Sequence, residues 1–367
     1  MKRKFIVITL LTLIFVSLFT SITGAETVDG AGLTLSDAQK EAEANSKQAV
    51  IDDLDIKAKE AGLNRAKSDA KLPISVYGNE SIITERIRQQ VKPIEAETSL
   101  ELAKMTKEDN AGKLKRNIKS SFLYILLAQR ELELANKKLG IAKERLEMTE
   151  ARYSTNIITE QDLVSSQNDV FSKTIDVEGI KENLRILDMR LKDLMGLPLD
   201  GEMLVLEGTI ELESFPEVDI EKVISTEVEK DIEVYSTAGK YYASKRTLEL
   251  IEGLLKPGNE TYDRYEIELA KATRDYESIK RNCEINIRNT FNDLLNLRDS
   301  VELAIKFEEL QIKILDNAKI IYGKGLMSKE EYIASEEKYL DAVYSKYKAI
   351  CDFNIKNAEF LNLAGIE

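Results

Sequence analysis

The chain has 367 residues, of which 32% are charged, and its formal net charge is -13. This acidic balance disfavours nucleic-acid binding, which needs a basic surface to displace counterions from phosphate. The sequence contains no His or Trp and no Cys-x-x-Cys, phosphate-loop or Gly-x-Ser-x-Gly pattern, so it predicts a protein that is not an enzyme, with no catalytic, cofactor or metal site.

Residues 1–25 have the pattern of a secretory signal peptide. Three basic residues, Lys2 to Lys4, precede an apolar run from Phe5 to Phe19, and small residues end the segment at Ala25. An uncleaved membrane anchor is the competing interpretation, although the run is shorter than the ~20 residues of a spanning helix. We therefore expect an exported protein of the cell envelope, in the periplasm or outer membrane if the host has one, and otherwise outside the cytoplasmic membrane.

The next segments predict helices punctuated by prolines. A helix should begin at a capping Ser36 and continue to about Lys71, because Pro73 follows. Residues 74–92 are compatible with an extended excursion, an irregular loop or a broken helix. From about Glu97 to Tyr153 no proline interrupts the chain, which predicts one long helix of roughly 85 Å at 1.5 Å per residue.

The chain contains one pattern twice. Residues 117–197 align with residues 286–366 without a gap, at an offset of 169 residues. In each copy apolar or small residues recur in steps of three and four, which is typical of a coiled-coil seam. In the first copy the seam begins with Ile118, Ser121, Ile125, Ala128, Leu132, Ala135 and Leu139. The sequence thus predicts an all-α, elongated, internally duplicated pair of antiparallel coiled-coil hairpins, with little or no β structure.

Each hairpin should bend at a short tip. Asn156 and Gly325 are equivalent in the two copies, and both residue types tolerate the left-handed conformation common at helix ends. The return helix restarts in both copies on a hydroxyl residue. Ser328 with Glu331 fits a capping box, and Thr159 with its following acid is a weaker version.

Between the copies lies a connector, residues 198–218, in which a brief strand near Leu204 is possible. A helix from Asp219 to Leu255 and a short crossover then lead into the second long helix. The predicted organisation is a first repeat at 33–197, the connector, and a second repeat at 219–367. Folding the second hairpin about its tip separates Cys283 from Cys351 by roughly 24 Å, so both thiols should be unpaired.

These features in this order resemble the TolC-like outer membrane efflux proteins, also called outer membrane factors. The resemblance rests on the opening Leu33-Thr-Leu-Ser-Asp-Ala, on the tips Tyr153–Asp162 and Tyr322–Glu331, and on hairpin ends at Gly196 and Gly365. It covers nearly the whole chain after the signal peptide, and the duplicated order is more specific than any single motif.

The resemblance implies a homotrimer whose hairpins form a helical conduit. The helix tips of such proteins meet a periplasmic adaptor (membrane fusion) protein, which couples the conduit to an inner-membrane ABC or RND pump. Carried over to this chain, the docking residues are Asn156, Ile157 and Thr159 in one tip and Gly325, Leu326 and Ser328 in the other. The competing interpretation is that these polar residues and the glycine only terminate and cap helices.

The sequence departs from the family at its crossovers, where the usual member carries membrane β-hairpins. A membrane strand needs ~9 to 11 residues. Lys256–Asp263 is too short for two such strands, and residues 74–92 could barely hold them. We therefore expect the membrane hairpins to be absent or vestigial.

The leading hypothesis is a conduit component of an envelope export system. The alternative is a structural or interaction coiled coil of the cell envelope without a transport lumen. An enzyme is a distant third hypothesis.

Overall fold

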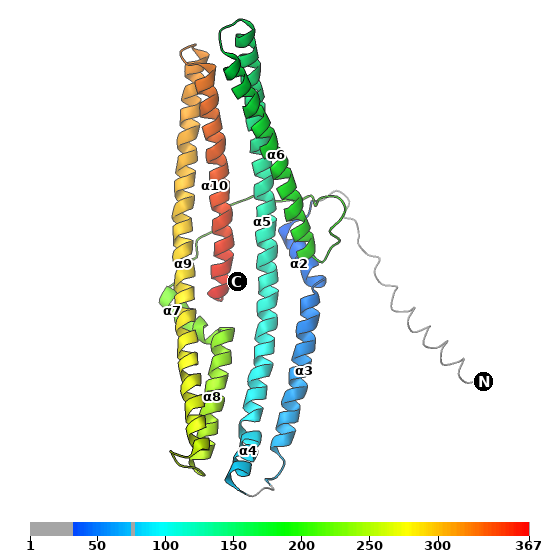
Figure 1. Ribbon diagram of the computed structural model, residues 1–367, viewed down its shortest axis with the longest axis vertical. Helices are drawn as coiled ribbons and strands as arrows, with labels where there is room; N and C mark the ends of the chain where they lie inside the picture. The colour runs from blue at the N-terminus through cyan, green and yellow to red at the C-terminus, as the bar shows by residue number, and fades with distance from the viewer. Residues whose placement is uncertain (1–31, 75–77, 367) are drawn as a thin grey trace, which may run out of the picture.

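The computed structural model describes residues 32–74 and 78–366, so the predicted signal peptide at residues 1–25 lies outside the described residues. The described chain is an elongated bundle of helices (Figure 1). Its only β contact among these residues is an isolated parallel bridge between Leu33 and Leu206, which is all that forms of the possible strand in the connector.

The first predicted helix is divided into two. α2 covers Leu35–Ala44 and α3 covers Lys47–Ala70. Thr34, rather than the expected Ser36, caps α2, because its hydroxyl accepts a hydrogen bond from the backbone N–H of Asp37. Ser46 then caps α3 in the same way, so the single helix predicted here was wrong.

The crossover after α3 contains a helix, α4 (Asn79–Gln90), so the broken helix is the alternative that holds over these residues. Its side chains bind the ends of two other helices. Arg86 donates to the carbonyl of Leu250 at 3.2 Å, and Arg88 donates to the carbonyl of Leu72 at 3.2 Å. Carbonyls at helix C-termini have no partner within their own helix, so α4 stabilises both ends.

The first hairpin consists of α5 (Lys92–Ser154) and α6 (Glu160–Leu194). α5 has 63 residues and starts earlier than predicted. Pro93 lies in its first turn, where a missing N–H costs nothing, so the proline begins the helix instead of delaying it.

The second half follows the same plan. α7 (Ile220–Glu227), the short 3-10 helix η1 (Val228–Lys230) and α8 (Ile232–Glu252) replace the single helix predicted from Asp219 to Leu255. The helix breaks because the Asp231 carboxylate accepts from the N–H groups of Glu233 and Val234 and so starts α8 anew.

The second hairpin consists of α9 (Glu260–Gly323) and α10 (Lys329–Leu363). The helix ends of the two hairpins fall at equivalent residues. Ser154, Glu160 and Leu194 lie 169 positions before Gly323, Lys329 and Leu363. The duplicated, all-α hairpin fold predicted from the sequence is therefore confirmed.

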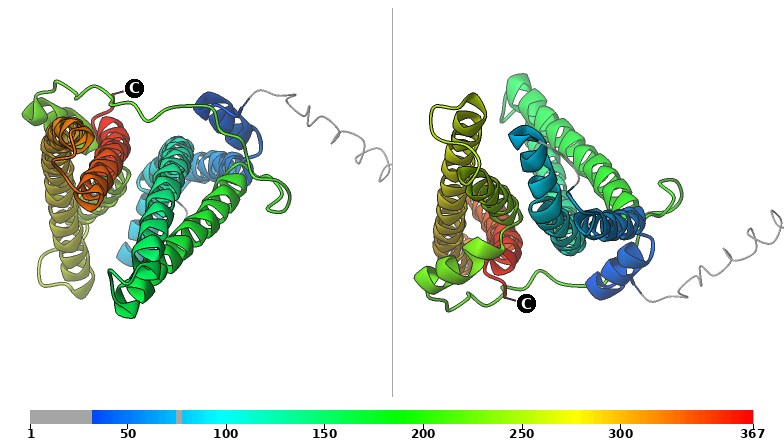
Figure 2. Two further views of the ribbon diagram at one scale, coloured as in Figure 1. Left: turned by 90° about the horizontal axis from the view of Figure 1, so that it is seen from above. Right: turned by 90° about the horizontal axis from the view of Figure 1, so that it is seen from below.

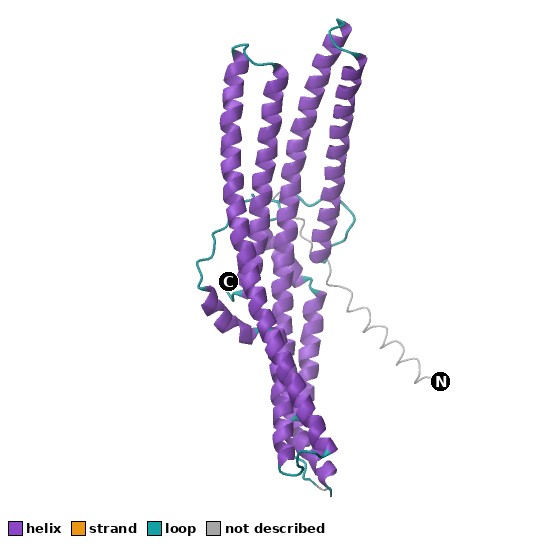
Figure 3. Cartoon of the chain, turned by 60° about the vertical axis from the view of Figure 1, so that its left-hand side comes forward, coloured by secondary structure: helices purple, strands orange, loops and turns teal. Residues whose placement is uncertain are grey.

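The two hairpins point the same way, so that both tips lie at one end of the molecule (Figure 1 and Figure 3). α5 and α9 run the length of the bundle. α6 and α10 pair with their tip halves, and α3 and α8 pair with their other halves. Seen along the long axis, α5 and α10 face each other, while α6 and α9 form the outer flanks (Figure 2).

The main core lies midway along the bundle, where the helices of both halves meet. Its most buried large side chains include Ile118, Ile125, Leu191, Ile287, Phe353 and Phe360. The connector crosses this level and is bound by both return helices. Lys192 of α6 donates to the carbonyl of Glu202 at 2.7 Å, and Asn354 of α10 donates to the carbonyl of Glu211 at 2.7 Å.

Among the described helices, none joins sufficient length to sufficient apolar character to cross a bilayer.

Candidate functional site

The two tips have the same backbone geometry. Asn156 and Gly325 both have a positive φ, 55° and 70°. The N–H of Ile157 donates back to the carbonyl of Arg152 at 3.0 Å, and the N–H of Leu326 donates to that of Ile321 at 3.1 Å. This six-residue bond closes a helix end that has a left-handed residue after its cap.

The return helices start on complete capping boxes. Thr159 and Ser328 accept from the N–H groups of Asp162 and Glu331, and the two carboxylates accept the N–H groups of Thr159 and Ser328 in return. The hydroxyl and N–H of Thr159 lower the pKa of Asp162, while the N–H and then the hydroxyl of Ser328 lower the pKa of Glu331. Four of the six predicted tip residues thus have a structural role in the turn.

Ile157 and Leu326 are the exceptions. Their side chains are 72% and 76% exposed, and only their backbones take part in the turns. Apolar side chains exposed at equivalent points of two neighbouring tips indicate a contact surface better than capping residues do. The following residues, Ile158 and Met327, are half-buried.

The second tip carries a feature that the sequence pattern did not predict. Tyr322 and Tyr332 stack with ring centroids 5.1 Å apart, and the Lys329 ammonium lies 5.5 Å and 5.1 Å from their centroids. The same ammonium pairs with Glu144 of α5 at 2.9 Å, and this hydrogen bond raises the pKa of Lys329 against the opposing effect of burial. This ion pair links the second tip to the first hairpin.

The two hairpins meet along a seam between α5 and α10, which we call the internal seam. Its apolar part comprises Leu134, Ile141, Ile333, Leu340 and Val343. Ion pairs flank it. Arg152 pairs with Glu330 at 2.7 Å, Arg145 with Glu337 at 3.0 Å, and Lys138 with Asp341. The cations recur every seven residues on α5, so they follow the same heptad as the apolar contacts. A search for cations offset by four from the apolar seam could have found them.

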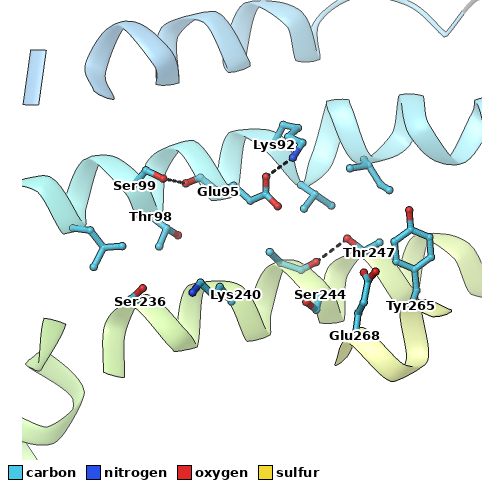
Figure 4. Close-up of a pocket in the computed structure, with 15 residues that line it drawn as sticks. Lys92, Glu95, Thr98, Ser99, Ser236, Lys240, Ser244, Thr247, Tyr265 and Glu268 are labelled. Atoms are coloured by element: carbon cyan, nitrogen blue, oxygen red, sulfur yellow. Dashed lines mark hydrogen bonds and ion pairs between the residues drawn. The ribbon is translucent and has the colours of Figure 1, made fainter. Parts of the chain in front are cut away.

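A groove of about 540 Å³ lies in the half of the bundle away from the tips, between α5 and α8 (Figure 4). Hydroxyl residues line it, with the ion pair of Lys92 and Glu95 at one side. The hydroxyls of Ser99 and Thr247 donate to carbonyls of their own helices, at 2.8 Å and 2.9 Å. Hydroxyls used in this way are ordinary for polar helix faces, so the groove shows no nucleophile activated by a base.

The other polar clusters give no chemical centre. Within residues 32–74 and 78–366, no group of three or more Cys, Asp or Glu side chains is placed to hold a metal ion. Both cysteines are unpaired, as predicted. Burial raises the pKa of Cys283 to about 11 and that of Cys351 to about 12, which is typical of structural rather than reactive thiols.

The fold that carries these tips has counterparts among solved structures. No protein-family model matches the chain, and no curated protein matches it. Solved structures do match. The chain is similar to CusC, a transmembrane channel, with TM-score 0.70 and 11% identity over 91% of this chain and 92% of that one. It is similar to the CmeC outer membrane channel of Campylobacter jejuni, with TM-score 0.69 and 12% identity over 90% and 85%.

A third similar structure is the outer membrane protein VceC of Vibrio cholerae, with TM-score 0.64 and 12% identity over 90% of this chain and 96% of that one. These similar proteins are channels and membrane proteins rather than enzymes. The chain therefore has the fold of the TolC-like outer membrane channels, and the resemblance predicted from its sequence is confirmed at the level of the fold.

Proposed function

We propose that the chain is an exported conduit subunit of an envelope export system. Copies assemble side by side, three by family resemblance, and dock through their tips to a periplasmic adaptor that couples them to an inner-membrane ABC or RND pump. The subunit resides in the periplasm or outer membrane. The proposal extends the fold similarity with solved channels to a passive efflux role.

The observation that carries the proposal is an apolar stripe on each outer flank. On α9 the stripe consists of Leu303, Phe307, Leu310, Ile314 and Ile321, and on α6 of Val164, Phe171 and Ile175, all of them exposed. Leu303 and Phe171 are each 67% exposed. Apolar residues at heptad spacing on an exposed helix face are typical of a coiled-coil seam without its partner helix. Neighbouring copies provide such helices.

The tips supply the docking surface of the proposal. Ile157 and Leu326 offer two apolar side chains at the same end of the molecule, supported by rigid capped turns. Only these two side chains of the six predicted tip residues are free of a role in the turn, so we assign adaptor contact to them first.

A deletion and complementation experiment tests this function. Loss of the gene should increase cellular accumulation of toxic compounds or dyes, and the wild-type gene should restore their efflux. Leu310→Lys should fail to restore it, because it places a charge in the stripe. Ile312→Lys is the control, since Ile312 is also exposed on α9, at 38%, but lies on the face away from the stripe.

Two results would contradict the proposal. Unchanged accumulation of every compound in the deletion strain would favour a structural coiled coil without a lumen. A purified wild-type chain that stays monomeric at micromolar concentration in mass photometry would remove the conduit altogether.

A further inference from the structure

The internal seam has a second, uncovered copy on the outside of the molecule. By the offset of the repeat, the α5 face of the seam is equivalent to a face of α9, and the α10 face is equivalent to a face of α6. Leu134 and Ile141, buried in the seam, correspond to Leu303 and Leu310, which are 67% and 55% exposed. The chain thus carries both halves of a second seam on opposite flanks.

The α6 half corresponds in the same way. Ile333 and Leu340 are buried against α5, and their equivalents Val164 and Phe171 are exposed on α6. α6 and α9 lie on opposite flanks of one chain (Figure 2), so they can meet only when one chain lies beside another. The contact is head-to-tail, which closes into a ring when the rotation per copy permits.

We propose that a second copy of this chain covers these faces, with α9 of one copy against α6 of the next in the register of the internal seam. This inference rests on the self-assembly in the proposed function and adds to it the pairing of residues. In this register Leu310 of one copy packs between Val164 and Phe171 of its neighbour, as Ile141 lies in one cluster with Ile333 and Leu340.

The charges of the two flanks fit this register. Three ion pairs of the internal seam are replaced by an apolar residue opposite a neutral polar one: Lys138 and Asp341 by Phe307 and Ser172, Arg145 and Glu337 by Ile314 and Asn168, Arg152 and Glu330 by Ile321 and Gln161. Both charges are absent from each replaced pair. Covering the α6 and α9 faces therefore buries no unpaired charge at these positions.

In the fourth ion pair the positive and negative residues are exchanged between the two helices. Glu144 on α5 pairs with Lys329 on α10 at 2.9 Å, and the equivalents are Lys313 on α9 and Glu160 on α6. Both are exposed, and within the described chain neither forms an ion pair. The proposed register brings Lys313 of one copy to Glu160 of the next, with the polarity exchanged and the complementarity kept.

Charge reversal tests this pairing in the full chain. Lys313→Glu and Glu160→Lys should each weaken association by about tenfold or more, because each sets like charges face to face in an interface. The double variant restores opposite charges and should recover most of the wild-type affinity. Mass photometry over a dilution series measures the association, and circular dichroism checks that each variant keeps its helices.

Lys319→Glu is the matched control, since Lys319 is exposed on α9 but lies on the face away from the stripe; it should leave association unchanged. Single variants that associate like wild type, or a double variant that gains nothing over the singles, would overturn the register while leaving self-assembly intact. A wild-type chain that never associates would overturn both this inference and the proposed conduit.

Discussion

At the scale of single residues, the tips show how two sequences reach one turn. Asn156 and Gly325 occupy equivalent left-handed positions, with φ of 55° and 70°. Glycine adopts this conformation without strain, and asparagine is among the few other residues that visit it regularly. The backbone requirement therefore explains both residue types, and the side chains that follow them are left free.

Gly325→Ala should strain the second tip by about 1 kcal/mol, because a Cβ disfavours positive φ. Nothing lies within 4 Å of that added Cβ, so the strain has no steric component from neighbours. Faster amide hydrogen exchange between residues 321 and 331, with little change in the rest of the molecule, is the expected result. Asn156→Gly serves as the control in the first tip and should leave exchange there unchanged; equal exchange in Gly325→Ala and wild type would contradict the assignment.

The two thiols differ in accessibility although burial raises both pKa values. Cys283 is half-buried with a pKa of about 11, and Cys351 is buried with a pKa of about 12. Since the thiolate is the reactive form, labelling of Cys283 by a maleimide should be slow at pH 7 and should still rise with pH above 9, where an ordinary thiol has levelled off. Cys351 should stay unlabelled until the chain unfolds. Mass spectrometry of labelled peptides distinguishes the sites, and rapid labelling of either at pH 7 would contradict this account.

At the scale of helices, α4 shows what the sequence could not reveal. Residues 79–90 are mostly polar, and their short apolar face, Ile83 and Ile87, packs with Leu248 and Ile251 of α8, so the helix is stabilised by what it contacts. Asn79 and Arg86 donate to the carbonyls of Leu254 and Leu250, far along the chain. Local periodicity does not contain such contacts. By contrast, both tips and both return helices follow capping patterns that are local, and these were predicted within a residue or two.

The crossing of α5 and α8 depends on a glycine. A Cβ added at Gly239 would lie 2.4 Å from the Cγ2 of Thr98, far inside van der Waals contact. Gly239→Ala should therefore destabilise the chain by about 1 to 3 kcal/mol, the range of overpacked helix contacts. Urea unfolding measures the effect.

Thr98→Ala removes the clashing methyl and provides the companion variant. The double variant should recover part of the lost free energy of unfolding, because the two side chains are in direct contact. Gly253→Ala, in a position with nothing within 4 Å, controls for the general effect of replacing a glycine. Strictly additive losses in the double variant would show that the clash is relieved elsewhere.

At the scale of the whole molecule, the internal seam and the outer stripes differ in chemistry. Four ion pairs flank the internal seam, whereas the stripes are apolar apart from Lys313 and Glu160 at their edges. Heptad periodicity predicted these faces but could not name their partners, because every face with this spacing looks alike in sequence. The charged residues, read together with the offset of the repeat, distinguish them.

Salt should separate the two kinds of contact. At about 1 M salt the Debye length falls to roughly 3 Å, which screens partly exposed ion pairs while apolar burial persists. Hydrogen exchange in the internal seam should therefore increase, while the oligomeric mass stays constant. Dissociation of the oligomer at high salt without a change in the internal seam would contradict this assignment.

The charged residues along one side of α10 also determine which helices can pack against each other. If the α10 helix of one molecule displaced α6 from a neighbour's α9, Glu337 and Asp341 would confront Ile314 and Phe307, and each carboxylate would lose water without gaining a cation. The same mismatch recurs one heptad further on, where Glu330 would face Ile321. In the proposed assembly, the different side chains of the two seams therefore favour α9 against α6 over α9 against α10.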